Sequence, residues 1–248
     1  MTAAEARSFK ELVPFPPAAP TLLETHGTTV LALRFDKGVL LLADRRATAG
    51  NLIMYDLADK IFPLDDSTVV AISGAFARSV EVCRYLKHSF KYYRRSVLQE
   101  MSLEGKLTEI SRALAGNAPM AMQGIGVFLP IVAAYDKQTG DFGVYFFDGA
   151  GARFQNGSYA CAGSGSERIR GVFEYIARMK GQFHDRPLDE VLSDGLQMLD
   201  IAADLDSATG GFNKILPVTR VLDSEGNRDL PEDMVRKASQ KVLRGSKT

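Results

Sequence analysis

A Gly-Thr-Thr sequence at residues 27–29 precedes an apolar run and places two hydroxyl groups where a strand should begin. A threonine hydroxyl becomes a nucleophile when a base is near, and a free α-amino group, with a pKa of about 8, can be that base. Thr28 would gain such an amine if its hydroxyl attacked the Gly27 carbonyl, shifted the acyl group from nitrogen to oxygen, and released residues 1–27 by hydrolysis. Gly27 obstructs this attack least, whereas Thr29 follows a β-branched residue, so Gly27-Thr28 is the predicted autocleavage site. The alternative is that threonine simply favours strands and glycine simply favours turns.

Two charged residues at the ends of apolar runs could support this chemistry. Asp44 ends the run at 38–44, and Lys60 enters the next one. Lys60 beside Thr28 would lower the pKa of the amine and of the hydroxyl through its positive charge, and Asp44 would keep Lys60 charged and oriented. Taken singly, each residue also fits an ordinary turn carboxylate or surface lysine.

Other catalytic and metal-binding patterns are missing from the sequence. Its three histidines, His26, His88 and His184, lie in no recognisable motif, and there is no HExxH, Walker or GxGxxG sequence. Cys83 and Cys161 are the only cysteines, which excludes a disulfide framework and a Cys-based zinc site. The cysteine usage therefore predicts a reducing, cytoplasmic location.

Composition and charge are those of a globular chain with one large domain. The chain has 248 residues, 46% hydrophobic, with 30 basic and 30 acidic side chains in balance. No basic stripe and no apolar stretch near 18 residues occurs, which argues against nucleic-acid and membrane partners. Residues 1–27 contain several prolines and lack the pattern of a secretory signal, so they are predicted to be a separate propeptide before a catalytic domain at 28–248. The adjacent Arg45 and Arg46 are interpreted as interface or surface residues rather than a phosphate site.

The periodicity predicts segregated runs of strands and helices, and therefore an α+β fold with antiparallel sheets covered by helices. Gly116 and Pro119 are interpreted as stop signals of the second helix, and Asp185 as a possible cap of the fourth, which Pro187 opens. The segment at 149–157 is expected to be a turn-rich link. The expected strands are 28–35, 38–44, 67–73, 124–136, 141–148, 157–164 and 216–223. The expected helices are about 75–95, 103–114, 165–180 and 188–203, with a last one from 231.

Five ordered motifs together resemble the β-subunit of the bacterial 20S proteasome of the actinobacterial type. They are "GTTVLALRFDKGVLLLADRRATAGNLI", "DKIF", "SGAFA", "AGSGS" and "DSATGG", and the similarity runs from Gly27 to about residue 235. The resemblance implies the N-terminal nucleophile hydrolase fold, a four-layer αββα sandwich of two antiparallel sheets, and a threonine-type endopeptidase activity.

The resemblance also implies a role for each matching site residue. Thr28 matches the nucleophile, Asp44 and Lys60 the charged pair behind it, and Gly74 the N–H donor of the oxyanion hole. Three further matches are Ser164 and Asp206, which would organise the α-amine and its water, and Thr209, which would support them. From the residues alone, Ser164 could equally cap the helix that follows it. The residues matching the substrate-binding positions are Thr48, for the peptide backbone, and Ala47, Ala58, Ile72 and Phe76, around a first specificity pocket.

These small or apolar pocket residues predict cleavage after hydrophobic residues, with Phe76 narrowing the pocket. The resemblance further implies seven-membered β-rings enclosed by rings of α-subunits in a stacked four-ring particle. A ring-shaped unfolding ATPase would deliver unfolded polypeptides through the α-ring. The resemblance implies no metal or organic cofactor. Two alternatives remain open at this stage, namely another N-terminal nucleophile amidohydrolase acting on small amides and a structural β-like subunit that never matures.

Overall fold

The computed structural model describes residues 27–50 and 52–245, which form two five-stranded antiparallel sheets, a short hairpin and flanking helices. The predicted propeptide, apart from Gly27, lies outside the described residues. The first sheet has the order β10-β1-β2-β11-β12, with bounds Tyr159–Gly163, Thr29–Phe35, Gly38–Ala43, Val218–Asp223 and Gly226–Asp229. The second has the order β5-β6-β7-β8-β9, with bounds Ile61–Asp65, Thr68–Ala71, Ile131–Tyr135, Phe142–Phe147 and Arg153–Asn156.

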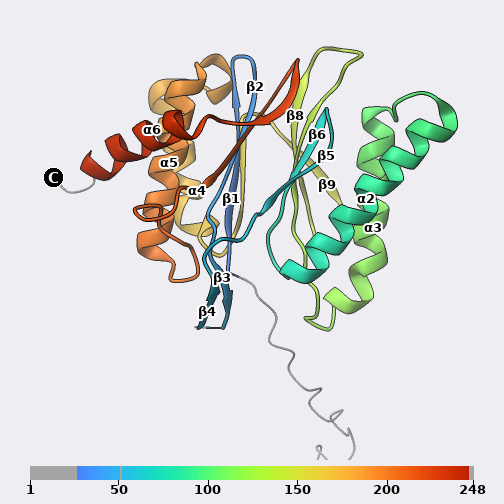
Figure 1. Ribbon diagram of the computed structural model, residues 1–248, viewed down its shortest axis with the longest axis horizontal. Helices are drawn as coiled ribbons and strands as arrows, with labels where there is room; N and C mark the ends of the chain where they lie inside the picture. Colours follow the sequence, from blue (N-terminus) through green and yellow to red (C-terminus); the bar gives the residue numbers. More distant parts are fainter. Residues whose placement is uncertain (1–26, 51, 246–248) are drawn as a thin grey trace, which may run out of the picture.

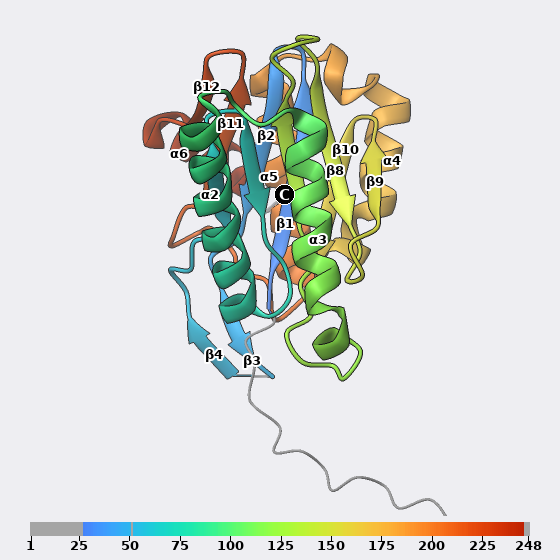
Figure 2. The same cartoon turned by 90° about the vertical axis from the view of Figure 1, so that its right-hand side faces the viewer.

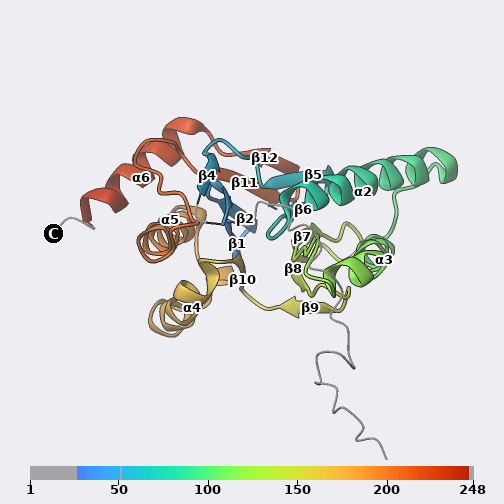
Figure 3. The ribbon, with the colours of Figure 1, turned by 90° about the horizontal axis from the view of Figure 1, so that it is seen from below.

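Helices cover the outer face of each sheet, which produces the four layers seen in Figure 1 and, from below, in Figure 3. One helical layer consists of α4 (Ser166–Lys180), α5 (Leu188–Leu205) and α6 (Glu232–Gly245). The other consists of α2 (Phe76–Val97) and α3 (Leu103–Ala121), which run side by side in Figure 2. A 3-10 turn, η1 (Phe183–Asp185), joins α4 to α5. The predicted αββα sandwich of antiparallel sheets is confirmed.

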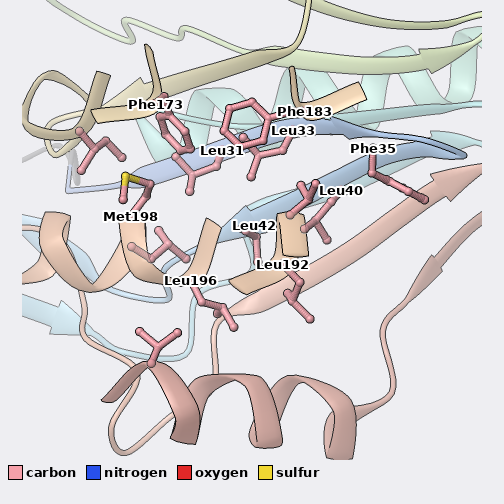
Figure 4. Packing of buried hydrophobic residues seen from close by; sticks show 14 of the residues in the cluster. Leu31, Leu33, Phe35, Leu40, Leu42, Phe173, Phe183, Leu192, Leu196 and Met198 are labelled. Carbon is pink, nitrogen blue, oxygen red and sulfur yellow. The ribbon is translucent and has the colours of Figure 1, made fainter. Parts of the chain in front are cut away.

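Burial on both faces explains why β1 and β2 read as continuous apolar runs. Leu31 and Leu33 on β1 point to α4 and α5, as the close-up in Figure 4 shows, whereas Val30 and Ala32 pack between the two sheets. Each buried leucine contributes about 1.5–3 kcal/mol of hydrophobic stabilisation relative to exposure. These central strands therefore hold the first sheet rigid, including its end at Thr29.

Two of the expectations about helices are wrong. α3 continues beyond Leu114 to Ala121, with Pro119 inside its last turn. A proline there forfeits only one main-chain hydrogen bond, and the buried Asn117 side chain anchors this turn by donating to Gly126 O at 2.7 Å. Asp185 does not cap α5, because it lies in η1 and α5 begins after Pro187 with no side-chain cap.

Some short strands were not expected from the sequence. β9 occupies part of the segment read as a turn-rich link, and β12 follows the turn after β11. A separate hairpin of β3 (Ala47–Ala49) and β4 (Leu52–Tyr55) projects from one end of the sandwich. β1 begins at the same end, and β2 ends there, since Val30 pairs with Ala43.

Candidate active site

Thr28 lies directly before β1 and is 4% exposed. Its hydroxyl donates to the Gly27 carbonyl oxygen at 2.5 Å, so the nucleophilic atom rests against the group it would attack. The neighbouring Gly163 has φ +99°, and a Cβ there would lie 2.0 Å from Thr28 O. Only glycine permits this approach of the β10 end to the chain before β1.

Gly27 is confined on two sides. A Cβ built on it would lie 2.2 Å from Thr48 Oγ1 and 2.7 Å from the Ala208 carbonyl oxygen. The residue before Thr28 is therefore glycine for reasons of space, in addition to the low obstruction it offers at its own carbonyl.

Asp44 and Lys60 form an ion pair with no exposed side-chain surface, Nζ to Oδ1 at 2.7 Å. Asp44 Oδ1 also accepts from Thr29 N at 2.8 Å, and Oδ2 accepts from Arg46 N and Gly210 N, both at 2.9 Å. Because a buried carboxylate is costly unless its oxygens are paired, the four donors satisfy both oxygens of Asp44 just after the end of β2.

The Lys60 amine hydrogen-bonds to the carbonyl oxygen of the peptide bond before Thr28. Besides Asp44, Nζ donates to Arg46 O at 2.6 Å and to Gly27 O at 3.3 Å, which uses all three protons of an ammonium group. Burial lowers the pKa of Lys60 below its ordinary value, and the charge and hydrogen bond of Asp44 only partly oppose this. Asp44 thus favours the charged form of Lys60, while burial makes its proton easier to release.

A second polar cluster joins the ends of β10 and α5. Ser164 Oγ donates to Asp206 Oδ2 at 2.6 Å and lies 3.4 Å from Thr28 O. Thr209 Oγ1 also donates to Asp206 Oδ2 at 2.6 Å and lies 2.7 Å from Thr29 Oγ1. Burial raises the pKa of Asp206. The hydrogen bonds from these two hydroxyls and from Ala208 N, together with the charge of Arg168, outweigh burial and hold the pKa below its usual value. Ser164 therefore contacts the site and does not cap α4, whose first turn has no side-chain cap.

Comparison with known proteins identifies the family of this chain. The family model described as "Proteasome subunit" matches residues 24–216. The chain belongs to the proteasome subunit family. It is 33% identical over 231 residues to a proteasome subunit beta of Streptomyces griseus, covering 92% of this chain and 80% of that one. It is 36% identical over 212 residues to that of Acidimicrobium ferrooxidans, covering 84% and 75%. With that of Acidothermus cellulolyticus it shares 34% over 235 residues, covering 92% and 77%.

Gly74, in this proteasome-family chain, occupies the turn between β6 and α2 with φ +97°. It pairs with Phe128 in an isolated bridge, whose two hydrogen bonds run from Ala75 N to Val127 O and from Leu129 N to Ser73 O. Neither of these bonds uses the Gly74 N–H. The geometry is compatible with its predicted role as a donor to a substrate oxygen.

Most of the predicted substrate-binding residues are buried near the hairpin end of the sandwich. Ala47, Ala58 and Ile72 are 8%, 3% and 2% exposed, and Phe76 begins α2, half-buried against the core between α2, α3 and the second sheet. Thr48, in β3, is 4% exposed, and the contact described above places it beside Gly27.

The sequence analysis did not predict the contacts of the Arg46 side chain or of the backbone at 207–210. Arg46 was interpreted as an interface or surface residue. Its side chain is 23% exposed, and it also contacts this loop. Gly210 and Ala208 act through backbone atoms, on Asp44 and beside Gly27. Only the "DSATGG" motif indicated this loop. Contacts made by backbone atoms cannot be predicted from the type of side chain, because every residue has the same backbone groups.

The two cysteine thiols are poor nucleophiles in this fold. Burial raises the pKa of Cys83 to about 12 and that of Cys161 to about 11. Within residues 27–50 and 52–245, no cluster of three or more His, Cys, Asp or Glu side chains is arranged to hold a metal ion. In the same part of the chain, no helix has the length and apolar character needed to cross a bilayer.

Proposed function

We propose that this chain is a catalytic proteasome β-subunit that hydrolyses peptide bonds of unfolded polypeptides with Thr28 as an N-terminal nucleophile. The observation that carries the proposal is the convergence on one peptide bond of the Thr28 hydroxyl and the Lys60 amine, both on the Gly27 carbonyl. Residues 1–27 are then a propeptide, and 28–248 the mature catalytic domain.

Maturation uses this convergence directly. Thr28 Oγ1 attacks the Gly27 carbonyl carbon, a C–O ester bond forms as the C–N bond breaks, and the hydroxyl proton passes to the departing nitrogen, which becomes the free α-amine. Water then hydrolyses the ester and releases residues 1–27 with a new carboxylate at Gly27. Lys60 polarises the carbonyl during attack, since one of its protons already points at the oxygen. Once the Gly27 carbonyl has left, the Lys60 proton that was bonded to it is free to hydrogen-bond to the Thr28 hydroxyl oxygen.

In the mature enzyme the freed α-amine is the base for substrate cleavage. The α-amine takes the hydroxyl proton as Thr28 Oγ1 attacks the substrate carbonyl carbon. The scissile C–N bond then breaks, the proton passes to the departing amine, and an ester-linked acyl-enzyme remains. Water hydrolyses this ester and restores the Thr28 hydroxyl. Gly74 N–H stabilises the oxyanion, a contribution of about 3 kcal/mol for one such donor. Ser164, Asp206 and Thr209 orient the amine and its water, which the hydroxyl network reaching Thr28 O and Thr29 supports.

The substrate lies along β3 as an added strand. β3 pairs with β4 on one side, and Gly27, the residue before the scissile bond, packs against Thr48 on this strand. Ala47, Ala58, Ile72 and Phe76 line an apolar first pocket, so cleavage follows hydrophobic residues. Phe76 makes that pocket narrower than a small residue would.

Subunits of this family assemble into proteasome particles. For this chain the proposed assembly has seven-membered β-rings between rings of α-subunits, served by a ring-shaped unfolding ATPase and located in the cytoplasm. Removal of the propeptide only after assembly would keep the active threonine enclosed.

The test is the intact mass of the chain after co-expression with its α-subunit. The wild type should lose residues 1–27 and cleave reporter peptides after hydrophobic residues, whereas Thr28→Ala should keep the full mass and be inactive. Thr139→Ala, in the exposed β7–β8 turn, is the matched control and should mature normally. A wild-type chain that keeps its full mass in the assembled particle would refute the proposal and identify a structural subunit. Maturation without any ring assembly would favour a small-amide hydrolase.

A further inference from the structure

We propose that the Arg46 side chain is a positioning residue that ties the loop at 206–210 to the Asp44–Lys60 pair and so sets the geometry of the Thr28 site. This inference rests on the proposed function, because it assigns a role within that peptidase site.

The Arg46 side chain connects the residue before β3 to Asp56 and to the distant loop at 206–210. Its Nη1 donates to Ser207 O at 3.2 Å and to Thr209 O at 3.4 Å, and its Nε donates to Asp56 Oδ1 at 3.0 Å. Its stem also packs on the loop, since a Cβ built on Gly210 would lie 2.9 Å from Arg46 Cβ. The guanidinium therefore holds the loop at two carbonyls while Asp56 fixes its outer side.

The loop held by Arg46 supplies three of the site's contacts. Gly210 N donates to Asp44, Thr209 Oγ1 contacts both Asp206 and Thr29, and the Ala208 carbonyl lies beside Gly27. Loosening the loop would thus disturb the Asp44 carboxylate and the chain on both sides of Thr28 together. A displacement of about 1 Å in a reacting group can slow a reaction about 100-fold.

Arg46 also acts on Lys60 through its charge. The charged groups facing Lys60 are Asp44, Arg46 and Asp206, of which the two carboxylates favour the ammonium form and the guanidinium disfavours it. Removing the guanidinium charge should raise the pKa of Lys60 and, by the same electrostatic rule, that of the nearby α-amine.

Lysine should replace arginine only in part. A lysine retains the charge, but its single ammonium lacks the planar fork that reaches the loop carbonyls and Asp56 together. Two variants can therefore separate the effect of charge from that of positioning. Arg46→Lys keeps the positive charge but not the contacts of the guanidinium. Arg46→Met loses both the charge and these contacts but preserves most of the aliphatic part of the side chain.

The experiment measures kcat, KM and the pH profile of peptide cleavage by assembled particles of the full chain with its α-subunit. Arg46→Met should lower kcat about tenfold or more with KM within about twofold, and should move the pH profile to higher pH. Arg46→Lys should return the profile to its wild-type position with only partial recovery of kcat. Arg45→Met is the matched control, because Arg45 Nε donates to Leu216 O and not to the loop, and it should retain wild-type kcat.

Two results would overturn the inference. One is an Arg46→Met particle with wild-type kcat and pH profile, and the other is a loss of kcat that Arg45→Met shares equally. If Arg46→Met does not assemble, the Asp56→Asn variant tests the inference instead. This substitution weakens only the contact between Arg46 Nε and residue 56 and leaves the Arg46 side chain in place. It should lower kcat about two- to fivefold, and an unchanged kcat would overturn the inference. A wild-type particle without peptidase activity would instead refute the proposed function.

Discussion

Substituting alanine for Gly27 tests whether the space around the scissile bond controls maturation. The new methyl group would lie 2.2 Å from Thr48 Oγ1 and 2.7 Å from the Ala208 carbonyl oxygen. The Thr48 hydroxyl can move by rotation about χ1. The Ala208 carbonyl cannot move so easily, because it belongs to the backbone of a loop whose neighbouring residues bind Asp44 and Asp206.

The size of the expected effect follows from these distances. To reach the 3.4 Å of ordinary contact, the methyl group must move about 0.7 Å from Ala208 O and about 1.2 Å from Thr48 Oγ1. Most of that movement falls on the Gly27-Thr28 peptide, so the carbonyl leaves the Thr28 hydroxyl and the Lys60 amine. Since a 1 Å misplacement can cost about 100-fold in rate, Gly27→Ala should slow autocleavage about 10- to 100-fold.

The assay follows propeptide release by intact mass over time after assembly. Gly116→Ala is the matched control, because Gly116 is exposed in α3 with no atom within 4 Å of an added Cβ, and it should mature at the wild-type rate. Adding Thr48→Ala to Gly27→Ala should recover only part of the rate, since the backbone contact at Ala208 remains. Maturation of Gly27→Ala at the wild-type rate would refute this reasoning.

Two further predictions concern charge and packing. Asp206 has a pKa held below its ordinary 3.8 by the hydroxyls of Ser164 and Thr209. Its stabilising effect is therefore present above pH 3.8 and is lost as the pH falls through the lowered value, so the denaturation midpoints of wild type and Asp206→Asn should differ at pH 7 and converge in acid. A constant difference down to pH 3 would contradict this. Leu42→Ala, at a fully buried position among β1, β2 and α5, should lower the free energy of unfolding of the full chain by about 2–5 kcal/mol. Leu52→Ala, 64% exposed on β4, should change it by about 0.5 kcal/mol or less, and equal effects in urea titrations would contradict the packing argument.

Much of the architecture could be predicted from local sequence. Apolar runs with short turns predicted the central strands, and the 3.6-residue period predicted the start of each main helix, because these signals depend on neighbours along the chain. The end of α3 was misplaced because Pro119 falls in the last turn, where the buried Asn117 side chain anchors the helix to Gly126. β9 was missed because its pairing with β8, a contact outside its own segment, is what makes it a strand.

The sequence by itself determined that a hydroxyl nucleophile follows a glycine at residue 28, and that an aspartate and a lysine end or begin apolar runs. Which atoms meet was decided only by the tertiary structure. The three contacts of Lys60 Nζ, the four donors around Asp44 and the Arg46 tie to the 206–210 loop join segments up to 166 residues apart. Many of these contacts end on backbone atoms, which every residue carries alike, and so no pattern of side chains can reveal them before the chain has folded.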